Sequence, residues 1–260
     1  MRTLAARRHH RLAPVFLVFA LLIIITAIYA IITANRASAS DEYSADQVAE
    51  GEKLFAANCA TCHGLDGSGS DIAPSLVGVG AAAVDFQVGT GRMPQQATGP
   101  QAPVKPGVFD EDEIAELAAY VASLGEGPAV PIPAKYDASE ADAAYGMQLF
   151  RVNCAMCHGS VGGGGALTQG KYAPALWDTT PEHIYEAMIT GPSNMPVFND
   201  ANITPEGKRD IIAYLEAQRE GSPGGLGLGA IGPVGEALWV WILGVGLIIA
   251  ITVWVGARSS

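Results

Sequence analysis

Two short segments hold all four cysteines of this 260-residue chain. Residues 59–63 read Cys-Ala-Thr-Cys-His, and residues 154–158 read Cys-Ala-Met-Cys-His. Two thiols at this spacing can each form a thioether bond with one vinyl group of haem, and the adjacent histidine can then ligate the iron. We therefore predict two covalently bound haem c groups. The predicted attachment residues and proximal iron ligands are Cys59, Cys62 and His63 for haem 1, and Cys154, Cys157 and His158 for haem 2.

Cys-x-x-Cys pairs also occur in disulfide redox centres and in zinc sites. A structural zinc site needs its second cysteine pair about 15–20 residues further on, but here the two pairs start 95 residues apart (154 − 59). A thioredoxin-like pair does not require a following histidine, yet the histidine is present in both segments. Covalent haem attachment is therefore the favoured interpretation.

The distal ligand of each iron must come from elsewhere in the chain. Met93 and Met195 each precede a proline, 30 residues after His63 and 37 residues after His158, respectively. Methionine often fills gaps in apolar cores, but neither of these two lies on an apolar helical stripe. A thioether sulfur is a common distal ligand in cytochromes c. We therefore predict the ligand pairs His63/Met93 for haem 1 and His158/Met195 for haem 2.

Three other methionines and one further histidine fit different roles. Between the apolar ends of the chain, His183 is the only histidine outside the two motifs, so at most one haem could have two histidine ligands. Because His183 falls in the first turn of an expected helix, we predict that it lies at the surface. The methionines expected to serve packing are Met147, Met156 and Met188.

Long apolar runs occupy residues 13–33 and 237–256. Each has about the 20 residues that an α-helix needs to cross a bilayer. Four arginines precede the first run and Arg258 follows the second, which predicts cytoplasmic termini and an external segment 37–236. The first run, followed by Ala-Ser-Ala at 37–39, also resembles a signal peptide. Its apolar core is longer than the usual 7–15 residues, which favours an uncleaved anchor.

The external segment contains one α-helical unit twice, and it carries a net charge of −17 (9 Lys and Arg minus 26 Asp and Glu). Capping residues predict helix starts at Ser44, Asp110, Ser139 and Thr180. A linker with three prolines separates the units. The predicted organisation is a cytoplasmic N-terminus (1–12), a transmembrane helix or signal peptide (13–33), a first haem domain (41–125), a stiff linker (126–138), a second haem domain (139–220), a Gly-rich tether (221–236) and a transmembrane helix (237–256).

Each unit resembles a small cytochrome c in which the first and last helices cross. Gly51 and Phe55 would lie on the first helix, and Leu117 and Tyr120 on the last, so that glycine lets the backbones approach and the aromatic rings fill the crossing. The second unit repeats this set as Gly146, Phe150, Ile211 and Tyr214. The resemblance implies an all-α fold of two tandem class I cytochrome c-like domains flanked by transmembrane helices.

The chain as a whole resembles the dihaem cytochrome c subunit of the actinobacterial cytochrome bcc complex, a bc1-type menaquinol–cytochrome c reductase. The likeness is carried by residues 84–94, 170–174 and 190–196 and by the Gly-rich approach to the last helix. In that family the subunit sits beside a cytochrome b subunit, accepts electrons from a Rieske iron–sulfur subunit and passes them to an aa3-type cytochrome c oxidase. The resemblance implies these partners, no quinol site in this chain, and hydrogen bonds from the proximal histidines to the carbonyls of Pro74 and Pro174.

Two other functions compete with electron transfer in a bcc complex. A dihaem peroxidase needs an open or displaceable sixth position on one iron, and the two predicted methionine ligands argue against it. The dihaem subunit of a cbb3-type oxidase also combines a membrane anchor with tandem haem domains. The C-terminal anchor and the short Gly-rich tether of this chain disfavour that alternative.

Overall fold

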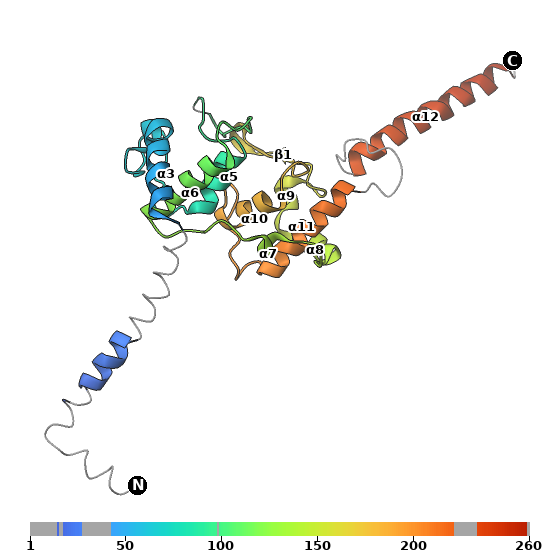
Figure 1. The fold of residues 1–260 in the computed structure, drawn as a ribbon. Coiled ribbons are helices and arrows are strands. Elements are labelled where there is room, and N and C mark those ends of the chain that lie inside the picture. The colour runs from blue at the N-terminus through green and yellow to red at the C-terminus, as the bar shows by residue number, and fades with distance from the viewer. Residues whose placement is uncertain (1–14, 16–17, 28–42, 98, 221–232, 259–260) are drawn as a thin grey trace, which may run out of the picture.

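The computed structural model describes residue 15 and residues 18–27, 43–97, 99–220 and 233–258 (Figure 1). The labelled elements of this part of the chain are α3 (Ala45–Asn58), α4 (Ala60–His63), α5 (Ala81–Gly89), α6 (Glu111–Leu124), α7 (Pro133–Tyr136), α8 (Ala143–Asn153), α9 (Ala155–His158), β1 (Gly165–Ala166), η2 (Thr168–Gly170), β2 (Tyr172–Ala173), α10 (Pro181–Thr190), α11 (Pro205–Glu220) and α12 (Pro233–Arg258). The mostly helical content agrees with an all-α fold. The small departure is the antiparallel pair β1–β2, whose strands have two residues each.

In each domain the first and last helices cross at a glycine. A Cβ atom on Gly51 of α3 would lie 1.9 Å from the carbonyl oxygen of Glu116 on α6. A Cβ atom on Gly146 of α8 would lie 1.8 Å from the carbonyl oxygen of Asp210 on α11. Any larger residue would collide with the backbone of the partner helix, so glycine sets how closely the two helices pack.

Aromatic rings fill both crossings, as the sequence predicts. The rings of Phe55 and Tyr120 are 5.0 Å apart, and those of Phe150 and Tyr214 are 5.4 Å apart. Each tyrosine hydroxyl donates to a backbone carbonyl in the loop after the haem motif, at 3.3 Å and 2.7 Å. Both phenylalanines are 1% exposed. Through these tyrosine hydroxyls, the last helix of each domain is hydrogen-bonded to the loop that follows the motif histidine.

Replacing Gly146 with alanine is expected to destabilise the second domain by at least about 1–3 kcal/mol, the usual effect of overpacking. The expected cause is displacement of α8 from α11, because the contacting atom is backbone and cannot rotate away. Thermal unfolding of the holoprotein measures the change. Gly107→Ala is the matched control, since its Cβ would meet nothing closer than 3.9 Å. Equal melting temperatures for the two variants would contradict this account.

Most of the predicted helix starts are confirmed, and one is wrong. Ser44 and Asp110 each form a complete capping box, and the Thr180 hydroxyl accepts a hydrogen bond from the backbone of α10. Ser139 does not cap α8. Asp142 caps this helix instead. Its carboxylate accepts hydrogen bonds from the backbone N–H groups of Ala144 at 2.9 Å and Tyr145 at 3.1 Å, which have no partner within the first turn of the helix.

The two haem domains contact each other through α5 and α10 (Figure 1). A second link lies in the loops, where the backbone N–H of Tyr172 donates to Gln101 Oε1 at 3.0 Å. The linker packs against the second domain through its short helix α7, which contacts α10 and α11. In addition, the Arg209 side chain donates a hydrogen bond to the carbonyl of Ala134 at 3.4 Å. The segment predicted as a stiff linker thus contains a short helix, α7, a single turn that begins at a proline.

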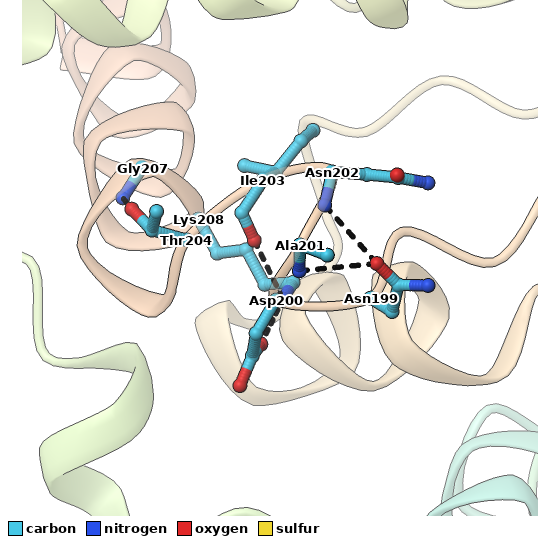
Figure 2. A network of polar contacts seen from close by, with 8 residues as sticks. All are labelled: Asn199, Asp200, Ala201, Asn202, Ile203, Thr204, Gly207 and Lys208. Atoms are coloured by element: carbon cyan, nitrogen blue, oxygen red, sulfur yellow. Dashed lines mark hydrogen bonds and ion pairs between the residues drawn. The ribbon is translucent and has the colours of Figure 1, made fainter.

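A polar network fixes the loop that leads into α11 (Figure 2). The ammonium group of Lys208 is buried, donates to Asp200 Oδ1 at 2.6 Å and to the carbonyl of Ile203 at 3.0 Å, and lies 5.7 Å from the Tyr185 ring centre. The Asn199 side chain accepts hydrogen bonds from two backbone N–H groups of the same loop. This network anchors the C-terminal end of the loop that carries Met195.

One helix of the described residues is long and apolar enough to span a membrane, judged by length and composition. It covers Ala237–Arg258 within α12 and agrees with the transmembrane helix predicted at 237–256. Of the first predicted run, the structure describes an apolar helical stretch, Val18–Ala27. The rest of that run and the possible cleavage site at 37–39 lie outside the described residues. The same is true of most of the predicted Gly-rich tether.

Candidate haem sites

One cavity in the second domain brings together four predicted haem-binding side chains, those of Cys154, Cys157, His158 and Met195. Cys154 directly precedes the short helix α9, Cys157 and His158 belong to it, and Met195 lies on the loop after α10. Most of the remaining wall is apolar. It includes Phe150, Leu176, Ile184, Met188, Ile211 and Leu215. Two thiols, one imidazole and one thioether at an apolar cavity form a donor set that fits haem c.

The first domain repeats this arrangement. Cys59 and Met93 both pack against its buried cluster, on α3, α5 and α6, as Cys154 and Met195 pack against the cluster of the second domain. A single helical turn follows the first cysteine in each case and ends at the motif histidine. The internal repeat of the sequence is therefore also a repeat of the site.

Both motif histidines, the predicted proximal ligands, are oriented by the carbonyl of a proline. His63 Nδ1 lies 2.9 Å from the Pro74 carbonyl oxygen, and His158 Nδ1 lies 3.0 Å from that of Pro174, as the resemblance implies. A carbonyl oxygen only accepts, so Nδ1 carries the proton and Nε2 keeps its lone pair for a metal. Burial lowers the pKa of His158, and the hydrogen bond to Pro174 offsets part of this effect. The lowered pKa favours the neutral imidazole, which is the form that binds a metal.

Backbone hydrogen bonds hold both methionine loops against their domains. The N–H of Met93 donates to the carbonyl of Gln87 at 2.9 Å, and that of Met195 donates to Pro192 at 3.0 Å. Both side chains are half-buried. The structure therefore places each methionine at its own domain's core cluster, against which the first cysteine of the haem motif also packs.

The thiol environments do not match those of a redox pair. Burial, with a smaller contribution from the second cysteine of each motif, raises the pKa of Cys59 to about 11 and that of Cys154 to about 12. Reactive Cys-x-x-Cys pairs instead have a thiol with a lowered pKa, because the thiolate is the nucleophile. The apolar setting favours the haem interpretation over a disulfide redox centre.

Several predictions for the other methionines and for His183 need correction. Met188 is buried, as predicted for a packing residue, but Met147 is 37% exposed and Met156 is 93% exposed. Met156 is exposed, whereas Cys154 and Cys157 of the same motif are half-buried. His183 does lie in the first turn of α10, yet its side chain is only 19% exposed, because α5 of the other domain covers it.

Three residues that the sequence does not single out reach the cavity of the second domain from the first. Phe86, Arg92 and Gln101 belong to α5 and the loops after it, yet all three line this cavity. The guanidinium carbon of Arg92 lies 4.7 Å from the Phe86 ring centre, and burial lowers the pKa of Arg92. No local pattern marks these residues, because their role depends on how the domains pack.

Two helical units with two such donor sets define a dihaem cytochrome c. Comparison with known protein families agrees with this class. Residues 48–125 match the model of the family described as cytochrome c. Residues 141–215 match that of cytochrome c oxidase, cbb3-type, subunit III.

The relatives of this chain belong to a more specific class of protein than the two domain families do. The cytochrome bc1 complex cytochrome c subunit of Mycobacterium tuberculosis is 42% identical over 97% of this chain and 93% of that protein. The subunit of the same name from Corynebacterium efficiens is 43% identical over 82% of this chain and 77% of that protein. This chain belongs to the family of cytochrome bc1 complex cytochrome c subunits, and it carries two covalently bound haem c groups.

The cbb3-type alternative has weaker support. The cbb3-type cytochrome c oxidase subunit FixP of Bradyrhizobium diazoefficiens is 33% identical, over 50% of this chain and 44% of that protein. Such a match covers part of each chain only, as expected for proteins that share cytochrome c domains. The likeness to bc1 complex subunits extends over most of both chains, so the cbb3-type function is not favoured.

Proposed function

We propose that this chain is the dihaem electron-transfer subunit of a bc1-type menaquinol–cytochrome c reductase. In this proposal it accepts electrons from a Rieske iron–sulfur subunit and delivers them to an aa3-type cytochrome c oxidase, beside a cytochrome b subunit. Quinol oxidation belongs to those partners, and this chain has no quinol site of its own. The support comes from relatives matched along most of their length and from the paired donor sets.

The proposed attachment residues are the four motif cysteines, and the proposed iron ligands are His63 with Met93 and His158 with Met195. A histidine–methionine pair favours ferrous iron and raises the reduction potential. It also occupies both axial positions and leaves none for a peroxide or another substrate. This set suits electron transfer and argues against a dihaem peroxidase.

The packing of the two domains is the observation that carries the proposal. Phe86, Arg92 and Gln101 of the first domain line the cavity of the second, so the two haem sites adjoin within one chain. Electrons can then pass from haem to haem without dissociation of a carrier. The half-buried Arg92 guanidinium is suited to pair with a haem carboxylate at this boundary, because a partly desolvated charge favours an ionic partner.

We further propose that the haem domains lie on the outer face of the cell membrane. The apolar helix α12 would anchor them from the C-terminal side and the run at 13–33 from the N-terminal side, giving a multi-pass chain. The four N-terminal arginines and Arg258 favour cytoplasmic ends. A chain fixed in this way conducts electrons as part of the complex and does not diffuse as a shuttle.

The test is oxygen uptake by the complex purified together with its oxidase. With a menaquinol analogue as donor, uptake is expected to proceed at full rate without added soluble cytochrome c, since this chain supplies the whole path between the Rieske subunit and the oxidase. Adding soluble cytochrome c is the control and is expected to leave the rate unchanged. Uptake that requires the soluble protein would contradict the fixed electron path. Co-purification of the cytochrome b and Rieske subunits tests the proposed partners directly.

A further inference from the structure

Three metal-binding side chains meet where the two haem domains contact each other. Asp85 comes from α5 of the first domain, and His183 and Glu186 come from successive turns of α10 in the second. His183 Nε2 lies 3.7 Å from Asp85 Oδ2 and 4.0 Å from Glu186 Oε2. One ligand atom from each residue lies within 4.8 Å of the other two. None of the three is a predicted axial ligand of a haem, and His183 also lines the haem cavity of the second domain.

Glu186 is unusual because its carboxyl group is fully buried and makes no hydrogen bond of normal geometry to the described residues. Its side chain is 0% exposed, and neither of its oxygens has a hydrogen-bond partner among the described residues. An unpaired polar group in such a place carries a desolvation penalty of about 1–3 kcal/mol, and a charged one carries more. Burial, followed by the nearby carboxyl groups of Asp85 and Glu182, raises the pKa of Glu186 to about 10. Among the described residues, His183 is the one basic side chain within 4.0 Å of the Glu186 carboxylate.

The surroundings leave His183 free to present Nε2 to the two carboxylates. The edge of the His183 ring faces Phe86, with centroids 6.0 Å apart. Gly89 lies beside Nε2, where a Cβ atom would come within 3.1 Å of this nitrogen. Apolar and small neighbours thus surround the imidazole on the side of the first domain, and the carboxylates of Asp85 and Glu186 are its polar neighbours.

One imidazole and two carboxylates are a donor set that zinc accepts, with bonds of about 2.0–2.2 Å and a fourth position for water. Ligand atoms around a tetrahedral ion of this size are roughly 3.3–3.5 Å apart. The separations from His183 Nε2, 3.7 and 4.0 Å, need only a small contraction, and the two carboxylate oxygens, which lie within 4.8 Å of each other, would have to move closer by up to about 1.5 Å. We propose that Asp85, His183 and Glu186 bind one divalent transition-metal ion, best matched by zinc, which joins the two haem domains.

A shared proton is the other way to relieve the repulsion between the carboxyl groups of Asp85 and Glu186. The two possibilities differ in what the protein retains after dialysis. A proton leaves no metal, whereas a three-residue site with one ligand from the other domain retains a zinc ion. Hard ions such as Mg²⁺ prefer oxygen ligands and should not displace zinc from an imidazole.

The test measures zinc and iron together in the full-length holoprotein, purified without a histidine tag. The protein is treated with chelator, dialysed against micromolar zinc in millimolar Mg²⁺, and analysed by elemental mass spectrometry. We expect one zinc for every two haem irons. Asp85→Asn and Glu186→Gln should each weaken zinc binding by about 100-fold or more, because even loss of a group that only supports a ligand costs 10–100-fold. Glu52→Gln, at an exposed carboxylate of α3, should bind as the wild type does.

The iron content reports whether each variant has folded with both haems. Asp85 is the decisive position, since its side chain is 23% exposed and its replacement leaves the core of the second domain unchanged. Less than one-tenth of an equivalent of zinc in the wild type would overturn the proposal in favour of the shared proton. Equal zinc in the wild type and in Asp85→Asn with two haem irons would also overturn it, because the zinc would then lie elsewhere.

Discussion

Replacing Met195 with histidine is expected to lower the reduction potential of haem 2 by the order of 100 mV or more, within the range of about 0.8 V over which axial ligands tune haem. Imidazole stabilises ferric iron better than a thioether does, so the change favours the oxidised haem. The haem should remain attached, because its thioether bonds do not involve this residue. Redox titration of the purified complex, followed by visible absorbance, measures the shift of one of the two haems.

The same variant should slow the complex as a whole. An electron would meet a step of lower potential at haem 2 and stall before it, so oxygen uptake driven by a menaquinol analogue should fall. Met147→His is the control, since Met147 is 37% exposed on α8 and lies away from the predicted ligands. A titration curve and an uptake rate that both equal those of the wild type would show that Met195 does not bind the iron.

The sequence predicts most of each haem site because the relevant signals are local. The haem motif specifies three of five consecutive residues, and the structure contains the expected hydrogen-bond contacts of the motif histidines with the carbonyls of Pro74 and Pro174. The helix crossings also follow from short patterns, in which Gly51 and Gly146 permit the contact that the aromatic residues fill. Local chemistry and local spacing are sufficient for features of this kind.

What the sequence misses depends on contacts between segments far apart in the chain. His183 has the pattern of a surface residue on its own helix, and only the approach of α5 covers it. Arg92 likewise becomes part of the second domain's cavity through the same packing. The helix start at Asp142 was missed for a different reason. Ser139 and Asp142 are both good capping residues. The backbone N–H of Asp142 also donates a hydrogen bond to Asp210 Oδ1 on α11 at 2.8 Å, which favours the helix start at Asp142.

Replacing Cys154 and Cys157 together with serine is expected to reduce covalent haem from two groups per chain to one. Serine has no thiol to form a thioether bond, and the motif of the first domain, at residues 59–63, remains intact. Pyridine haemochrome analysis of the denatured protein measures the haem that stays with the chain. The second domain should also lose protease resistance, because its apolar cavity would be left without the group around which it packs.

The mirror variant separates this explanation from a general failure to mature. Serine at Cys59 and Cys62 should likewise leave one haem, but now the second domain should be the protected one. Because the domains contact each other through α5 and α10, some loss of protection in the intact domain is expected near that interface. It should be smaller than the loss in the domain without haem, because each domain has its own buried cluster. Two haems retained in either variant, or haem that extracts freely into acidified acetone from the wild type, would show that the attachment does not use these cysteines.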